Sequence, residues 1–295
     1  MPEKQINRNA IITAAGIASR LVPLSFEKPK ALTFVRGEIL IERIIRQMQE
    51  AGICEIVVVV GYLKEQFEYL VDKFGVILVE NPDYNTRNTH SSIYCARDYF
   101  KNTIICPADE YFTENVFLKP SETSYYSLTF IPGHITDEWC ATMDASGRII
   151  DITLEGEGCW ITTDFAYIIE SDSTKMIPLL KAAYEDDNAK DFYWEDIWMA
   201  HMDEIQLYGQ KFENGVVQDL DTLSALQEFD NNFMDNLDCA VLNNISVALG
   251  EIKNKPADIQ NCTPIIQDNK LVGMSFTVDD ETFEYNHATQ AIHAR

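Results

Sequence analysis

The chain has 295 residues, of which 46% are hydrophobic, and its formal net charge is −24. This length and apolar content can bury the core of one large α/β domain and a smaller appendage. The acidic charge excludes nucleic acid and an anionic membrane surface as partners, because both would be repelled. If the substrates are phosphates, divalent cations must bridge them to the acidic groups.

The seven cysteines are scattered, odd in number and without a Cys-x-x-Cys pair, which is typical of a reducing compartment. The N-terminal residues contain no apolar stretch of signal-peptide length, and no other segment approaches a membrane span. We therefore expect a cytoplasmic protein.

A turn rich in small residues follows the first apolar run, residues 10–12. The stretch from Ala14 to Leu32, AAGIASRLVPLSFEKPKAL, predicts the end of a strand, a tight loop and a helix. Four of its residues are small, so their backbone N–H groups remain accessible to a polyphosphate. They are Ala14, Ala15, Gly16 and Ala18. Arg20 and Lys30 add positive charge on either side. The alternative is an ordinary connection between a strand and a helix.

The next segments alternate between helical and strand patterns. Residues 39–48 recur at helical spacing, residues 56–60 form a β-branched run, residues 64–74 are amphipathic, and short strands are expected at 76–79 and 103–106. This alternation of strands and helices predicts an α/β fold with a Rossmann-like, mixed but mainly parallel sheet flanked by helices. Ligands then bind at the carboxyl ends of the strands.

Two segments follow such carboxyl ends. The polar loop from Asn81 to Ser92 contains His90, which we expect to be a surface histidine. Asn88 can serve as a helix cap there. Asp109 follows the strand at 103–106, where an open α/β sheet places metal-binding carboxylates; the alternative is that Asp109 only caps a turn.

Acidic and aromatic residues adjoin in the second half of the chain. Strand patterns at 125–130 and 139–154, with a turn at 144–147, predict a mixed-sheet substrate subdomain. The adjoining residues are Glu138 and Trp139, and then Asp191, Tyr193 and Trp194. Aromatic faces with nearby carboxylates suit a quaternary ammonium group. The alternative is a hydrophobic core, which we expect for Phe192 and Trp198 at helical spacing.

A hairpin turn at residues 213–215 precedes a predicted strand at 216–222 and a final helix with Leu223 and Phe229 on one face. Asp219 and Asp221 lie two residues apart and would share one side of that strand. The competing interpretation is that Asp221 only caps the helix.

The stretch from Ala14 to Leu32 resembles the signature loop of the sugar-phosphate nucleotidyltransferases, L-A-A-G-x-G-S-R-x-x-P-L-(6)-P-K-A-L. It departs from that pattern at Ala18, where the family has glycine, and at Thr13. The resemblance implies the nucleotidyltransferase fold. It also implies that the loop holds a triphosphate through the backbone of residues 15–19, including Ser19, and through Arg20 and Lys30. It further implies that Asn88 and Ser92 contact the base, and that Asp109 and Asp221, with Asp219 sharing the role, hold Mg²⁺.

Three further motifs narrow the resemblance. The run at 58–67, the Asp137-Glu138-Trp139 motif and the Phe192-Tyr193-Trp194 cluster look like the bacterial CTP:phosphocholine cytidylyltransferase branch, over roughly residues 8 to 230. The resemblance implies transfer of a cytidylyl group from CTP to phosphocholine, which gives CDP-choline and pyrophosphate. It implies a choline cage made by Glu138, Trp139, Asp191, Tyr193 and Trp194. The alternatives are another acceptor, such as 2-aminoethylphosphonate or a sugar 1-phosphate, and a non-catalytic nucleotide sensor.

The tail is expected to be a separate unit, which divides the chain into residues 1–232 and a small α+β appendage, 233–295. A helix through Val241, Ile245 and Leu249 precedes two strands joined at Asp279-Asp280. This order resembles the opening of a choline kinase N-lobe. Since no catalytic lobe follows, we expect no kinase activity, and the tail would pack against the rest or mediate self-association.

Overall fold

The computed structural model describes residues 7–230, 239–249 and 259–295, apart from the side chains of residues 134, 135 and 137. The chain divides into two compact units. The first, here the sheet unit, comprises Met1–Ala15 and Ile41–Asp219, and the second, the loop-and-tail unit, comprises Gly16–Leu40 and Leu220–Arg295. The boundary expected between residues 232 and 233 lies outside the described residues, so that division stays a prediction.

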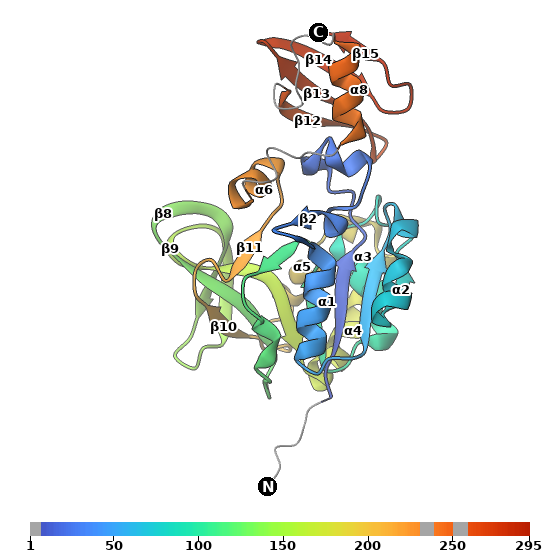
Figure 1. Ribbon diagram of the computed structural model, residues 1–295. Helices are drawn as coiled ribbons and strands as arrows, with labels where there is room; N and C mark the ends of the chain where they lie inside the picture. The colour runs from blue at the N-terminus through green and yellow to red at the C-terminus, as the bar shows by residue number, and fades with distance from the viewer. Residues whose placement is uncertain (1–6, 231–238, 250–258) are drawn as a thin grey trace. The chain divides into compact units, whose positions relative to one another are not determined.

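A seven-stranded sheet forms the centre of the sheet unit, in the order β10-β8-β9-β6-β1-β4-β5 (Figure 1). Strands β1, β4, β5 and β6 run parallel, β9 is antiparallel to both β6 and β8, and β10 is parallel to β8. The predicted mixed, mainly parallel sheet is therefore confirmed. The strands are β1 (Asn9–Ala14), β4 (Ile56–Val60), β5 (Ile77–Glu80), β6 (Thr103–Pro107), β8 (Tyr125–Met143), β9 (Ile149–Ile168) and β10 (Tyr208–Phe212).

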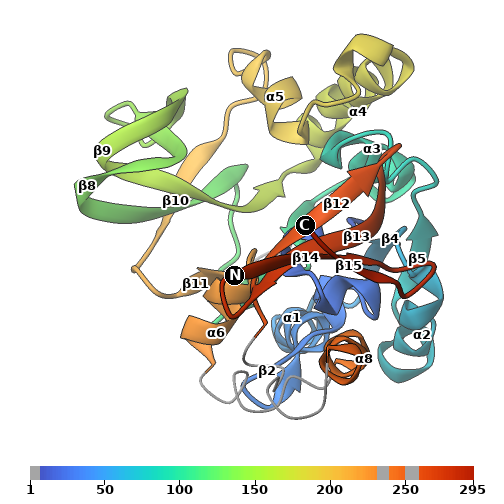
Figure 2. The ribbon, with the colours of Figure 1, turned by 90° about the horizontal axis from the view of Figure 1, so that it is seen from above.

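Helices flank the sheet on both faces, as Figures 1 and 2 show. They are α1 (Leu40–Glu50), α2 (Tyr69–Phe74), α3 (Thr89–Cys95), α4 (Glu170–Glu185) and α5 (Trp194–Met199). One core cluster joins Ile11 of β1 to Ile93 of α3, Leu180 of α4 and Trp198 of α5. Every residue of β4 is buried, as the unbroken β-branched run predicted for a strand covered on both faces.

Strands β8 and β9 form a long hairpin around the predicted turn at residues 144–147. The Asp144 N–H donates to the carbonyl of Arg148 at 2.9 Å, and Gly147 has a φ of +88°. A second ladder pairs β7 (Glu110–Phe112) with β11 (Val217–Asp219) in antiparallel register. The strand predicted at residues 216–222 therefore ends at Asp219, and Asp221 lies beyond it. Contrary to the prediction from the sequence, Asp219 and Asp221 do not share one side of a strand.

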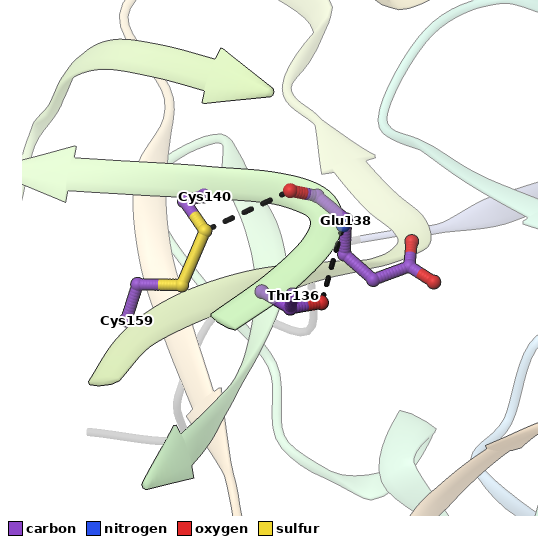
Figure 3. Close-up of a disulfide and its surroundings, with 4 residues drawn as sticks. All are labelled: Thr136, Glu138, Cys140 and Cys159. Atoms are coloured by element: carbon purple, nitrogen blue, oxygen red, sulfur yellow. Dashed lines mark hydrogen bonds between the residues drawn. A yellow bond between two sulfur atoms is a disulfide. The ribbon is translucent and has the colours of Figure 1, made fainter. Parts of the chain in front are cut away.

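A disulfide joins Cys140 of β8 to Cys159 of β9, whose Cα atoms lie 5.8 Å apart (Figure 3). The spacing of the cysteines along the chain indicated no such pair. Figure 3 shows the carboxylate of Glu138 pointing away from the disulfide, while its backbone N–H donates to Thr136 Oγ1 at 3.2 Å. The five other cysteines are free thiols.

The loop-and-tail unit begins with the small-residue loop. Its elements are η1 (Ser19–Leu21), η2 (Leu24–Phe26), η3 (Lys30–Leu32), β2 (Phe34–Val35), β3 (Glu38–Ile39), α6 (Leu223–Phe229), α8 (Ala240–Ala248), β12 (Gln260–Gln267), β13 (Lys270–Val278), β14 (Glu281–Asn286) and β15 (Ile292–Ala294). The helix expected within Ala14–Leu32 is wrong. Three short 3₁₀ turns replace it, because Pro23 and Pro29 lack the N–H that a continuous helix needs.

The tail forms an antiparallel four-stranded sheet, β12-β13-β14-β15, together with α8. The predicted hairpin at Asp279-Asp280 is confirmed, since both residues have the positive φ that a two-residue turn needs, 50° and 65°. The resemblance of this segment to a choline kinase N-lobe stays a prediction. In the part of the chain that the structure describes, no helix is long and apolar enough to cross a membrane.

Candidate functional site

Two cations of the small-residue loop converge on one carboxylate. Arg20 Nη2 and Lys30 Nζ form ion pairs with the two carboxylate oxygens of Asp221. The Lys30 side chain is only 6% exposed, whereas that of Arg20 is 65% exposed. The alternative role of Asp221 as a helix cap is wrong. Thr222 Oγ1 accepts from the N–H of Ala225 at 3.1 Å and is the N-cap of α6.

The small residues lead from β1 into this loop. Ala14 and Ala15 are buried, and the Ala15 carbonyl accepts from the N–H of Tyr62 at 3.0 Å. The position where Gly16 would carry a Cβ is open space. Ala18 has a φ of +51°, directly before Ser19 starts η1. This is the position where the family has glycine, and an alanine there accepts a strain of about 1 kcal/mol.

Carboxylates lie at the carboxyl end of β6 in the sheet unit. The N–H of Ala108 donates to the carbonyl of Thr13 at 3.0 Å, which places the following Asp109 beside the end of β1. Asp109 is half-buried, and Glu110 stands directly opposite Asp219 in the β7–β11 ladder. These carboxylates lie at the sheet edge where they were predicted, and their role in binding a metal stays a prediction.

The donors at this edge suit Mg²⁺, which binds oxygen ligands and commonly takes only one or two protein carboxylates, with phosphates and water completing the shell. Among the described residues, no group of three or more His, Cys, Asp or Glu side chains could hold a metal ion. A metal held through Asp109 would complete its coordination shell with other oxygens, such as those of phosphates or water.

Trp139 and Tyr193 form an aromatic corner. Their ring centroids lie 5.7 Å apart with the planes at 81°, and the Tyr193 side chain is 46% exposed. Glu138 and Asp191, which precede them in the sequence, are also exposed. Trp194 does not share this exposure. It is 3% exposed and stacks on the ring of Tyr126 at 5.7 Å, so it lies in the core rather than beside the corner.

Residues 10–120 match the family described as the MobA-like NTP transferase domain. The chain is 36% identical over 231 residues to the 2-aminoethylphosphonate cytidylyltransferase of Lancefieldella rimae, in an alignment that covers 77% of this chain and 93% of that protein. It is 30% identical over 221 residues to the choline-phosphate cytidylyltransferase of Streptococcus pneumoniae, covering 75% and 96%. The chain belongs to the cytidylyltransferase family.

Solved structures agree with this membership. The CTP:phosphocholine cytidylyltransferase from Streptococcus pneumoniae superposes with a TM-score of 0.73 at 30% identity, over 77% of this chain and 100% of that one. A putative glucose-1-phosphate thymidylyltransferase from Bacillus anthracis shares only the fold, with a TM-score of 0.61 at 17% identity over 76% and 94%. This cytidylyltransferase is therefore an enzyme of the nucleotidyltransferase class. Its relatives are named for different acceptors of the cytidylyl group, so family membership does not identify the acceptor of this enzyme.

Two residues expected at the base are engaged in internal hydrogen bonds. Asn88 Oδ1 accepts from the N–H of Thr89 at 2.8 Å and caps α3, which is the alternative role considered for it. Asn88 Nδ2 also donates to the carbonyl of Asp191 at 3.0 Å. Ser92 is buried, and its hydroxyl accepts from Asn81 Nδ2 at 3.0 Å. Contact of either residue with the base of CTP stays a prediction.

His90 is not the surface residue that its polar loop predicted. It is fully buried, and its Nδ1–H donates to the carbonyl of Phe192 at 2.7 Å. Burial lowers the pKa of His90, which favours the neutral ring, and the carbonyl partner requires that Nδ1 carries the proton. Asn88 and His90 together hold the backbone directly before Tyr193.

Glu195 is a buried residue that the sequence pattern did not single out. It lies in α5 and is 7% exposed, and the hydroxyl of Tyr126 donates to its Oε1 at 3.0 Å. Burial, reinforced by the charge of Asp164, raises the pKa of Glu195 well above its usual value. Its position between the buried Trp194 and Trp198 could have suggested burial, because all three belong to one short helix.

Proposed function

We propose that this cytidylyltransferase transfers the cytidylyl group of CTP to a small acceptor that carries a phosphate or phosphonate and a cationic amine, with release of pyrophosphate. The observation that supports this most directly is the convergence of Arg20 and Lys30 on the two oxygens of Asp221. Two cations that can bind adjacent oxygens of one anionic group can also bind the phosphate oxygens of a polyphosphate. Five free thiols favour a cytoplasmic location for the reaction, whereas the Cys140–Cys159 disulfide argues against it.

In this proposal, an oxygen of the acceptor attacks the α-phosphorus in line. The new O–P bond forms as the bond between the α-phosphorus and the bridging oxygen of the β-phosphate breaks, and pyrophosphate leaves with that electron pair. The chain supplies alignment and charge neutralisation. Arg20, Lys30 and the backbone of residues 15–19 would hold the triphosphate.

The bound triphosphate would compete with Asp221 for the two cations. As Arg20 and Lys30 turn to the phosphates, the Asp221 carboxylate becomes available to another cation. Asp109 and Asp221, with Asp219 sharing the role, would hold Mg²⁺, which neutralises charge on the phosphates when bound.

Phosphocholine is the first candidate acceptor. A quaternary ammonium group cannot donate hydrogen bonds, so it is held by aromatic faces, at roughly 0.5 to 2 kcal/mol per good contact. The perpendicular rings of Trp139 and Tyr193 offer such faces, and Glu138 and Asp191 add negative charge nearby.

The burial of Trp194 favours a second candidate, 2-aminoethylphosphonate. With Trp194 in the core, the corner has fewer aromatic faces than the full cage that the resemblance implied. A primary ammonium depends less on such faces, because it donates hydrogen bonds directly to carboxylates. The relative from Lancefieldella rimae is named for this acceptor.

Pyrophosphate release with Mg²⁺ tests the proposal. CTP, UTP, ATP and GTP would each be offered with phosphocholine, 2-aminoethylphosphonate and glucose 1-phosphate. We expect release only with CTP and an amine-bearing acceptor, and the ratio of kcat/KM between the two amines decides which one the corner fits. Release with glucose 1-phosphate alone would refute the amine acceptor, and no release with any pair would favour the nucleotide sensor.

A further inference from the structure

The segment of the small-residue loop between Arg20 and Lys30 contacts the tail of the chain. Phe26 of η2 is 5% exposed, and its ring stacks on the imidazole of His287, with centroids 4.4 Å apart and planes at 16°. Tyr285 of β14 meets the same ring edge-on at 5.9 Å. Both contacts lie within the loop-and-tail unit.

The next residue of the loop binds the start of α8. Glu27 Oε1 accepts from the backbone N–H of Val241 at 2.7 Å and lies 3.3 Å from Cys239 Sγ. A carboxylate at this place satisfies one of the free N–H groups of the helix and interacts favourably with its dipole. Burial raises the pKa of Cys239 to about 12, so the thiol keeps the proton that it donates to Glu27.

These contacts restrain a loop that has few regular hydrogen bonds of its own. Between Arg20 and Lys30 the backbone forms only short 3₁₀ turns, whose geometry is weaker than that of an α-helix. Two consecutive loop residues, Phe26 and Glu27, are held by two separate parts of the tail, the sheet and α8. The segment between Arg20 and Lys30 is therefore in contact with elements more than 200 residues further along the chain.

We propose that the tail, residues 239–249 and 259–295, is a positioning element that holds the nucleotide loop through Phe26 and Glu27. This rests on the proposed function, since the loop matters for catalysis only if Arg20 and Lys30 bind the triphosphate. The tail makes no chemical contribution in this proposal. It keeps the two cations at the separation at which both reach one anionic group, so its loss weakens nucleotide binding and leaves acceptor binding unchanged.

The test compares His287→Ala with His293→Ala in the full chain. Both histidines are exposed, but His287, in the turn after β14, stacks on Phe26, whereas His293 lies in β15. Loss of one aromatic stack should weaken the binding of CTP with Mg²⁺, measured by calorimetry without acceptor, by about threefold to tenfold. Hydrogen exchange of the amides in residues 19–32 should become faster in His287→Ala alone. The KM for the acceptor should not change.

A second pair of variants separates positioning from general damage. Glu27→Ala removes the acceptor of the Val241 N–H, whereas Glu27→Gln keeps an oxygen at that place. Glu27→Gln should therefore bind CTP more tightly than Glu27→Ala and restore slow exchange in the loop. Unchanged exchange or unchanged CTP affinity in His287→Ala would overturn the proposal, as would an equal effect in His293→Ala. If the unmodified protein binds no CTP, the proposed function fails, and the exchange rates alone then decide whether the tail holds the loop.

Discussion

Lys30 and Asp221 form an ion pair in which the ammonium group is almost completely buried. The Lys30 side chain is 6% exposed and that of Asp221 29% exposed, so water compensates the charge of Lys30 far less than that of Asp221. Arg20 adds a second positive charge to the same carboxylate. These three side chains together carry a net positive charge, which suits an anionic ligand.

The variant Asp221→Asn should therefore destabilise the protein before any catalytic effect is considered. It removes a negative charge that faces the buried Lys30 ammonium, which costs about 3 kcal/mol of unfolding free energy. The measurement is the urea unfolding midpoint. The matched control is Glu228→Gln, which removes an exposed carboxylate from α6 and should change the free energy by less than about 0.5 kcal/mol. Equal stability of Asp221→Asn and the unmodified protein would mean that Lys30 has another sufficient partner.

Asp109→Asn tests the carboxylate at the end of β6. Because the amide is isosteric but uncharged, the fold should persist while kcat falls by roughly a hundredfold or more, as expected when a group that stabilises transition-state charge is removed. The assay is pyrophosphate release across a Mg²⁺ titration, with Glu114→Gln, an exposed carboxylate nearby in the sequence, as the control. A normal rate at saturating Mg²⁺ would remove Asp109 from the metal site.

Trp139→Ala tests the aromatic corner. Removing the ring that meets Tyr193 edge-on should raise the KM for an amine-bearing acceptor by about tenfold and leave the KM for CTP within twofold. Steady-state kinetics with each substrate varied in turn measure this difference. Leu118→Ala, which truncates an exposed apolar side chain on η6 (Val116–Leu118), serves as the control. If both KM values rise together, Trp139 supports the hairpin rather than the acceptor.

His90→Phe tests whether the buried histidine positions the acceptor site. Phenylalanine fills the space but cannot donate to the Phe192 carbonyl, so the segment before Tyr193 loses a hydrogen bond worth about 1 kcal/mol. The KM for the acceptor should rise about fivefold, while the KM for CTP stays constant. His90→Asn, whose Nδ2 can replace Nδ1 as donor, should recover most of this loss. Failure of His90→Asn to recover it would show that ring packing alone is responsible.

Glu195→Gln tests the buried carboxyl through the pH dependence of stability. The folded state raises the pKa of Glu195 well above its usual 4.5, so the folded protein retains a proton that the unfolded chain releases. The stability of the unmodified protein should therefore fall as pH rises from about 4.5, by at most about 1.4 kcal/mol per pH unit from this group. Glutamine preserves the acceptor for Tyr126 and abolishes this slope.

Urea unfolding at pH 5, 6, 7 and 8 measures the difference. Glu195→Gln should gain stability relative to the unmodified protein as pH rises, whereas Glu204→Gln, an exposed glutamate after α5, should follow the unmodified protein. Parallel curves for Glu195→Gln and the unmodified protein would show that Glu195 is ionised in the folded state.

Local patterns in the sequence were sufficient for several elements of the sheet unit, although α4 and β10 were not predicted. The β-branched run of β4 has one stable environment, a strand covered on both faces, so its burial follows from composition alone. The turn at Asp144–Gly147 and the hairpin at Asp279-Asp280 need only a few neighbouring residues, and both are confirmed. The cationic loop and Asp109 could likewise be placed at carboxyl ends of strands, because parallel topology brings these ends to one edge.

Only the tertiary structure decided which residues of each cluster face the core. Tyr193 and Trp194 adjoin in sequence and differ little in polarity, yet Trp194 stacks on Tyr126, which is almost seventy residues away, and Tyr193 stays exposed. His90 is buried because a carbonyl about a hundred residues later meets its ring. The contacts of Phe26 and Glu27 with the tail span still longer separations. Sequence periodicity indicates the secondary structure of the segment that contains a residue. The burial of Trp194 and His90 and the contacts of Phe26 and Glu27 depend instead on partners that are distant in the sequence and that only folding brings near.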